Sequence, residues 1–382
     1  MKKLTIILGA GFSFEAGLPL GKDIQARFDR ELKGKLLLFS SGEWMWTDGK
    51  NKTDLNNGSL NYDYMAYSYV LNEYVKDYKL NRGSFMDYED FYQFIIDTEA
   101  NLNACKLLFK RAKSEFLKDN PSLNQDSYHL DPFKKPNYYR AKEILNYLIW
   151  DMLRFGKTKD ELLLTYKPFV DLIKEYDKVD IFTLNHDTLV EFLLEENNIN
   201  YTKGFSKVDS NIQYEEEPLE TYQGYQDTVS VRLYKMHGST DCYQFEHCNQ
   251  NGGFLERTGK GTYYLPNGYR ARHTSIRIDP KSGDVLQDYS PDPIPKFITG
   301  KDKTTIIKND YMYSDIYNQF FDNLKTTDNL LISGYSYRDD HVNEAIKDCR
   351  ATKIINQNPF DLFPFKKDHF NINKLEDINS VL

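Results

Sequence analysis

The chain has 382 residues, enough for one large domain or two of ordinary size. Its 40% hydrophobic and 28% charged residues permit a well-buried core, and its net charge of -8 argues against a general DNA-binding surface, which needs a basic footprint. The four scattered cysteines fit free thiols in a reducing cytoplasm. No apolar run approaches the length of a membrane-spanning helix.

The first predicted element is a strand over residues 3–8, rich in leucine and isoleucine and bounded by glycine. Lys2 and Lys3 resemble the start of a secretory signal, but the apolar stretch is short and soon reaches glycines and Glu15. We therefore expect a strand buried on both faces of a parallel sheet. A helix over about 13–32 should follow, interrupted near the sequence Gly-Leu-Pro.

The middle of the chain alternates between irregular and periodic stretches. Residues 33–65 carry turn signals, whereas 66–120 and 139–176 show helical periodicity around an intervening loop at 120–136. A second buried strand is predicted at 179–184, followed by a helix.

The second half is expected to be mostly β or irregular before it returns to α/β. In chain order, the expected elements are a polar, turn-rich region at 206–300 with short strands such as 229–235, a strand at 304–308, a helix at about 313–325, a third buried strand at 329–334, a helix at about 340–349, and a tail from 356 without a clear pattern.

This order predicts an α/β fold: a Rossmann-like parallel sheet with helices on both faces, a large helical insertion and a smaller irregular or β insertion, all in one domain. The assigned ranges are a core at about 1–32, 166–205, 228–240 and 300–350, a helical insertion at about 33–165, an irregular insertion at about 206–300, and a tail at 351–382. Open α/β sheets bind ligands at the carboxyl ends of their strands, so the segments after the strands are the candidate site.

The segment GAGFSFEAGLP at 9–19 follows the first strand. Glycine lets a backbone approach a phosphate, and amides at a helix N-terminus point toward it. The spacing is neither the dinucleotide GxGxxG nor a Walker A motif, since Gly21-Lys22 is followed by Asp23. The segment indicates a nucleotide-phosphate site, and the alternative is an ordinary tight turn between a strand and a helix.

Three polar residues, Asn185, His186 and Asp187, come directly after the second buried strand. Burying three such side chains is costly unless they are used. Helix capping by Asn185 or Asp187 is the alternative, and it accounts for one of them.

The last two segments are Met-His-Gly-Ser at 236–239 and GYSYRDDH at 334–341. His237 has the side chain best suited to proton transfer near neutral pH, although a lone histidine is more often structural. In the final segment, small residues allow a ligand to approach, while Asp339 or Asp340 could instead cap the next helix.

Taken in order, the four segments resemble the sirtuin family: Gly-Ala-Gly-x-Ser-x-x-x-Gly-Leu-Pro, then Thr-x-Asn-x-Asp, then His-Gly, then Gly-x-Ser. The resemblance runs from residue 9 to 336 and covers the nucleotide-binding core, not the insertions. Sirtuin-like proteins bind NAD across the ends of a Rossmann-like sheet and cleave its nicotinamide–ribose bond. That cleavage passes through an oxocarbenium-like state, which an amide, a carboxylate and an imidazole at one crevice could serve.

The resemblance assigns a role to each segment. Asn185 would position the nicotinamide ribose or the attacking water, Asp187 would contact the nicotinamide amide, and His237 would be the general base at the ribose. The first loop would hold the phosphates and the last would line the adenosine side. The implied NAD-binding residues are Gly9, Ala10, Gly11, Phe12, Ser13, Gly17, Gly334 and Ser336.

The chain departs from deacylating sirtuins, whose structural zinc module has two Cys-x-x-Cys pairs. No such pair occurs here, and Cys242, His247 and Cys248 lack the spacing of a tetrahedral zinc site, so we expect no metal. The family's Phe-Arg after the proline is also absent, replaced by Leu20-Gly21. These departures put acyl-peptide binding in doubt and leave NAD binding in place.

The expected activity is that of an NAD glycohydrolase releasing nicotinamide and ADP-ribose. The chain looks like the sirtuin-like effectors of bacterial anti-phage systems, which destroy NAD in abortive infection. The resemblance implies a stand-alone cytoplasmic effector that binds NAD, forms homo-oligomers and works with a HerA-type ATPase or an Argonaute-like protein. The surplus of 29 tyrosines and 24 phenylalanines would suit an oligomer interface.

Three alternatives remain open. The first is an NAD-dependent deacylase or ADP-ribosyltransferase, and the second is a non-catalytic NAD or ADP-ribose binding subunit of a defence complex. Nuclease activity ranks last, because no metal-carboxylate nuclease motif is recognisable.

Residues 257–277 interleave basic and aromatic side chains, which can bind nucleic acid through phosphate contacts and stacking. A solvated loop or an interface is the favoured interpretation. The side chains concerned are Arg257, Lys260, Arg270, Arg272, His273 and Arg277 with Tyr263, Tyr264 and Tyr269.

Overall fold

The computed structural model describes the chain in segments: residues 2–38, 44–47, 62–83, 88–121, 141–207, 213–214, 217–218, 220–226, 228–251, 254–265, 277–278, 285–287, 295–298, 303–360 and 362–380. No helix among these residues is both long and apolar enough to cross a membrane.

The chain divides into two compact units. The core unit comprises Met1–Leu18, Phe155–Ile298 and Lys303–Leu382, and the helical unit comprises Pro19–Arg154 and Thr299–Asp302. The chain enters the helical unit after Leu18 and leaves it after Arg154, and it returns briefly at Thr299–Asp302. The sequence patterns put the end of the first core segment at about 32 and the end of the insertion at about 165.

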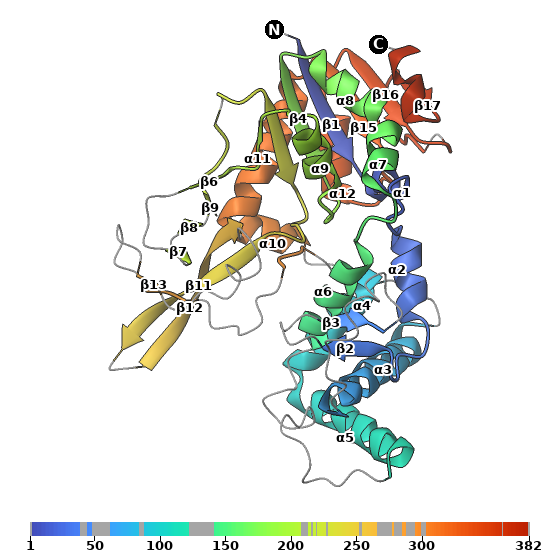
Figure 1. Ribbon diagram of the computed structural model, residues 1–382, viewed down its shortest axis with the longest axis vertical. Coiled ribbons are helices and arrows are strands. Elements are labelled where there is room, and N and C mark those ends of the chain that lie inside the picture. Colours follow the sequence, from blue (N-terminus) through green and yellow to red (C-terminus); the bar gives the residue numbers. More distant parts are fainter. Residues whose placement is uncertain are drawn as a thin grey trace. The chain divides into compact units, whose positions relative to one another are not determined.

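A seven-stranded sheet forms the centre of the core unit, and its neighbouring strands all pair in parallel (Figure 1). Its order is β17-β16-β15-β1-β4-β10-β5. In chain order the strands are β1 (Lys3–Leu8), β4 (Lys178–Thr183), β5 (Tyr201–Thr202), β10 (Val231–Lys235), β15 (Asn329–Ser333), β16 (Lys353–Gln357) and β17 (Phe370–Ile372). The parallel sheet predicted from the three buried apolar runs and the strand near 229–235 is confirmed.

Helices cover both faces of this sheet. Successive side chains of each strand point to opposite sides, so the apolar residues of a strand need a core on each face. Leu4, Ile6 and Leu8 of β1 pack in one core with α7 (Lys159–Thr165), α8 (Lys167–Lys174) and α9 (Leu189–Glu196). Ile7 packs in the other core with α10 (Lys303–Asn309), α11 (Tyr311–Thr326) and α12 (Asp340–Lys347). The predicted Rossmann-like layering is therefore confirmed.

The strand predicted at 304–308 is wrong, since these residues lie in α10. The run Thr-Thr-Ile-Ile favours a strand by side-chain type. Its burial follows the helical period instead: Lys303 and Ile307 are buried while the three residues between them are exposed. Packing of that one face onto the sheet outweighs the local preference.

The stretch predicted as an irregular or β insertion contains a six-stranded sheet of order β13-β14-β11-β12-β9-β6. Its strands are β6 (Phe205–Lys207), β9 (Glu220–Tyr222), β11 (Tyr243–Asn251), β12 (Phe254–Leu265), β13 (Arg277–Ile278) and β14 (Val285–Gln287). A separate pair is formed by β7 (Gln213–Tyr214) and β8 (Glu217–Pro218).

The helix predicted at 13–32 is split between the units. Its parts are α1 (Ala10–Phe14) and α2 (Gly21–Phe28), and Gly17 in the break has φ 76°. The rest of the helical unit consists of α3 (Tyr62–Arg82), α4 (Tyr88–Ala100), α5 (Leu102–Asp119), α6 (Ala141–Met152) and the strand pair β2 (Leu36–Leu38) and β3 (Trp44–Trp46).

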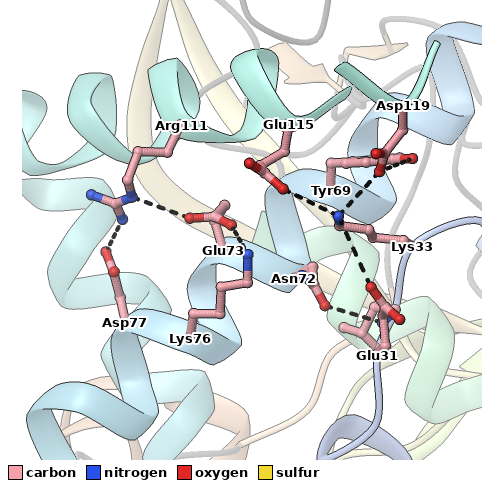
Figure 2. A network of polar contacts seen from close by, with 11 residues as sticks. Glu31, Lys33, Tyr69, Asn72, Glu73, Lys76, Asp77, Arg111, Glu115 and Asp119 are labelled. Carbon is pink, nitrogen blue, oxygen red and sulfur yellow. Dashed lines mark hydrogen bonds and ion pairs between the residues drawn. The ribbon is translucent and has the colours of Figure 1, made fainter. Parts of the chain in front are cut away.

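A polar network joins α3 to α5 in the helical unit (Figure 2). Arg111 of α5 donates to Glu73 at 3.1 Å and to Asp77 at 2.5 Å, both on α3. Lys33, in the loop after α2, donates to two carboxylates farther along α5: to Glu115 at 3.4 Å and to Asp119 at 3.1 Å. These contacts tie the loop after α2 and two helices together.

Candidate active site

The four sequence segments that resemble sirtuin motifs emerge at one edge of the parallel sheet. Strand register places Leu8 opposite both Thr183 and Ser333, and Thr183 opposite Lys235. The segments that follow these residues therefore leave the sheet side by side. This edge is where open α/β folds bind their ligands.

Two loops at this edge touch through glycine. The amide of Gly9 donates to the carbonyl of Ser333 at 3.0 Å, and that of Gly11 donates to Gly334 at 2.9 Å. A Cβ on Gly334 would lie 2.0 Å from the nitrogen of Phe12, and Gly334 has φ 63°. The loops thus need glycine for close packing, and the amides of Gly9 and Gly11 are engaged by the β15 loop.

Asn185 ties the loop after β4 to the loop after β1. Its Nδ2 donates to the carbonyl of Gly9 and to Oγ of Ser13, both at 2.9 Å, while Thr183 Oγ1 accepts from its backbone amide. Both amide hydrogens are used in this way, so Oδ1 is the group left to accept a hydrogen bond from a ligand or water. Ser13 is buried.

Asp187 performs a local structural task. It is buried, and its Oδ1 accepts a hydrogen bond from the amide of Leu189 in the first turn of α9 at 3.0 Å. Asp187 stands one residue before Thr188, the N-cap residue of α9, so neither Asn185 nor Asp187 is the N-cap that the sequence suggested as the alternative. The ammonium of Lys235 donates to the backbone carbonyl of Asp187, which joins the loop to β10.

Four charged side chains form a cluster next to this loop: Glu191 and Lys235 are buried, whereas Lys203 and Asp241 are half-buried. Glu191 is within 3.5 Å of Lys235 and 3.7 Å of Lys203, and Lys203 pairs with Asp241 at 2.6 Å. Desolvation is the largest influence on the pKa of Asp241, but the two lysines outweigh it and hold the pKa at about 2. No sequence motif marks this cluster, because its members are far apart in the chain.

His186 helps to join the loops after β4 and β10. Its ring stacks on Phe297 with centroids 4.5 Å apart, and its carbonyl accepts from the amide of Thr240 at 2.9 Å. Burial, with the charge of Lys235, lowers the pKa of His186 to about 3. This imidazole is therefore uncharged near neutral pH.

His237 follows β10 and is 4% exposed. Its Nε2 has no hydrogen-bond partner among the described residues, and it lies 4.0 Å from Oδ1 of Asp339. Burial, then the ammonium of Lys303, holds the pKa of His237 well below its ordinary value. The imidazole is therefore neutral and has an unpaired Nε2 among the described residues, but its lowered pKa makes it a weaker base than an ordinary histidine.

Three neighbours of His237 were given no part in the chemistry from the sequence: Lys303, Asp339 and His341. Asp339 is at the N-cap position of α12, but its side chain makes no cap bond and instead accepts from Lys303 at 3.0 Å. His341 contacts the hydroxyl of Tyr317 at 2.7 Å. Asp339 and His341 stood in the quoted final segment, whereas nothing near Lys303 marks it in the sequence.

The remaining candidate residues are placed as follows. Ala10 and Ser336 are exposed, Phe12 is buried, and Gly17 is exposed in the turn after α1, where a Cβ would lie 3.1 Å from Gly156. Cys242 is buried with a free thiol. The side chains of His247 and Cys248, and those of the basic residues at 257–277, lie outside the described residues.

Comparison with known proteins finds no matching family model and no matching curated protein. Among solved structures, the chain is similar to a Sir2 homologue in complex with NAD, at 13% identity and a TM-score of 0.35, over 99% of this chain and 86% of that one. It is also similar to Sir2Tm bound to a propionylated peptide, at 12% identity and a TM-score of 0.32, over 100% and 91%. Scores this low define neither a ligand nor an activity for this chain.

Proposed function

We propose that this chain hydrolyses the nicotinamide–ribose bond of NAD and releases nicotinamide and ADP-ribose. One observation carries the proposal: the parallel register brings the four sirtuin-like segments to a single sheet edge, where Asn185 is bonded to Gly9 and Ser13. The buried imidazole of His237, with its open Nε2, adds a proton acceptor in the same group of loops.

The proposed reaction uses few protein groups. Water attacks C1 of the ribose as the glycosidic bond breaks, and the bonding electrons leave with nicotinamide, which departs neutral. In the proposal, Oδ1 of Asn185 holds the ribose or the water, and His237 takes the proton that the water loses. Asp187 would contact the nicotinamide amide through Oδ2, the oxygen that does not accept from the amide of Leu189.

The phosphates and the adenosine side are assigned to the two loops that touch through glycine. The proposed NAD contacts are those at Gly9, Ala10, Gly11, Phe12, Ser13, Gly17, Gly334 and Ser336. The tight packing of these loops supports the proposal because it holds the two segments side by side at the sheet edge, although the amides of Gly9 and Gly11 are already bonded to the β15 loop.

The biological setting proposed with this activity is anti-phage defence in the cytoplasm. An NAD-destroying effector halts an infected cell, and the chain would act as a homo-oligomer with a HerA-type ATPase or another defence partner. This setting rests on the likeness of the motifs to those of sirtuin-like effectors and on the missing Cys-x-x-Cys pairs.

The test is nicotinamide release from NAD by the purified full chain, without an acylated peptide. Asn185→Ala and His237→Ala should each slow release by about 10²–10⁴-fold, the usual contribution of a positioned general base or of correct substrate placement. Asn197→Ala and His369→Ala are matched controls outside the site, and they should keep the wild-type rate.

Two results would favour the alternatives. If NAD binds but persists, even with a co-purified partner and DNA, the chain is a binding subunit rather than a hydrolase. If nicotinamide release requires an acylated peptide or a protein acceptor, the activity is that of a deacylase or an ADP-ribosyltransferase.

A further inference from the structure

Three potential metal ligands come together in the core unit, and His237 is one of them. His237 follows β10, while Asp339 and His341 flank the first residue of α12. One ligand atom from each of the three lies within 4.8 Å of the other two, and all three side chains are buried or half-buried. Strands far apart in the sequence therefore bring two imidazoles and a carboxylate to one point.

The buried nitrogen of His237 is a second and independent observation. Nε2 has no hydrogen-bond partner among the described residues, and the residue is 4% exposed. Burying such a group without a partner is unfavourable by about 1–3 kcal/mol. Coordination of an ion would use this lone pair.

The separations suit one ion after small side-chain rotations. A zinc ion binds nitrogen and oxygen at about 2.0–2.2 Å in tetrahedral geometry, so two of its ligand atoms are about 3.4 Å apart. His237 Nε2 and Asp339 Oδ1 are 4.0 Å apart. The contact of Tyr317 with His341 at 2.7 Å fixes that imidazole, as partners beyond the ligands do in metal sites.

The donor set selects a class of metal. Imidazole suits zinc, iron, nickel and copper, whereas magnesium and calcium prefer oxygen ligands. Two imidazoles and one carboxylate leave coordination positions open for water.

One charge already present opposes a cation here. The ammonium of Lys303 is 3.0 Å from Oδ1 of Asp339, the same oxygen that faces His237. An incoming metal ion must displace this ammonium from the carboxylate. Removing the ammonium should therefore strengthen metal binding, which gives the site a gain-of-affinity test.

We propose that His237, Asp339 and His341 form a binding site for a divalent transition metal of the zinc class. A metal ion there occupies Nε2 of His237. If the proposed hydrolase function holds, the ion also blocks the proton acceptor and inhibits NAD cleavage.

Binding of Zn²⁺ to the chelator-treated full chain, measured by titration calorimetry, tests the site without NAD. The wild type should bind one ion per chain, and His341→Ala should weaken binding at least tenfold. Lys303→Met should tighten binding, and this gain cannot arise from misfolding. His369→Ala removes a histidine outside the site and should change nothing.

Three outcomes would overturn the site: no Zn²⁺ binding by the wild type, an equal effect of His341→Ala and His369→Ala, or binding unchanged in Lys303→Met. Inhibition is read separately, as the ratio of each protein's rate with Zn²⁺ to its own metal-free rate. Zinc binding without NAD cleavage would sink the proposed hydrolase and leave the metal site intact.

Discussion

Gly334→Ala tests whether close packing of two backbone loops builds the candidate site. Gly334 has φ 63°, and an added Cβ would lie 2.0 Å from the nitrogen of Phe12 and 2.4 Å from the carbonyl carbon of Gly11. All three contacts nearest to it are backbone atoms, so no side chain can rotate away. The loops after β1 and β15 must separate.

The expected loss of stability follows from three contributions. An alanine in the left-handed region costs about 1–2 kcal/mol. Overpacking adds about 1–3 kcal/mol. Separation of the loops also breaks the 2.9 Å hydrogen bond from Gly11 to Gly334, which is worth about 1 kcal/mol. Together they predict a loss of about 3–6 kcal/mol.

Gly224→Ala is the matched control in the same unit. Gly224 has φ 86°, and the one atom near its added Cβ is a carboxylate oxygen of Asp315 at 3.6 Å, an ordinary contact. It should lose only the conformational contribution of about 1–2 kcal/mol. Urea unfolding of both variants measures the difference, and equal losses would refute the close-packing argument.

Three further predictions concern other parts of the molecule. Arg111→Met removes two ion pairs and should destabilise the helical unit by about 1 kcal/mol in urea unfolding. Lys76 is more exposed, so Lys76→Met should cost less than about 0.5 kcal/mol. Equal losses in the two variants would contradict a stabilising role of the network. Burial raises the pKa of Glu99 from 4.5 to about 7. The folded chain therefore holds the Glu99 proton more tightly than the unfolded chain, and the free energy of unfolding should fall by about 3 kcal/mol as the pH rises from 4.5 to about 7. Glu99→Gln should flatten that dependence, and an unchanged slope would show that another group causes it. Ser13→Ala removes one acceptor of the Asn185 amide, worth about 1 kcal/mol, and should slow NAD cleavage about fivefold to tenfold; a wild-type rate would argue against this positioning.

The central strands could be predicted because their signal is local. Runs such as residues 3–8 and 179–184 are mostly apolar, as is typical of strands buried on both faces. The strands β16 and β17 near the C-terminal end were not predicted. β17 is a short, mostly exposed edge strand, and β16, although buried at its centre, has only five residues; the pairing of both depends on the neighbouring strand rather than on their own pattern.

Site residues that directly follow a predicted strand could be identified from the sequence, whereas residues that only the tertiary fold brings together could not. Asn185 and His237 stand directly after strands, so their place at the sheet edge follows from the fold. Lys303 reaches Asp339 because α10 packs against one face of the parallel sheet, whereas the sequence suggested a strand at residues 304–308. The buried pairs of Glu191 with Lys203 and Lys235 depend on the tertiary fold in the same way.

NAD hydrolysis is tested by the product balance when the purified chain is incubated with NAD. Nicotinamide and ADP-ribose are quantified by chromatography with and without an acylated peptide. We expect equal amounts of both products and no dependence on the peptide. NAD that stays intact despite measurable binding, or an acylated ADP-ribose as the main product, would contradict this expectation.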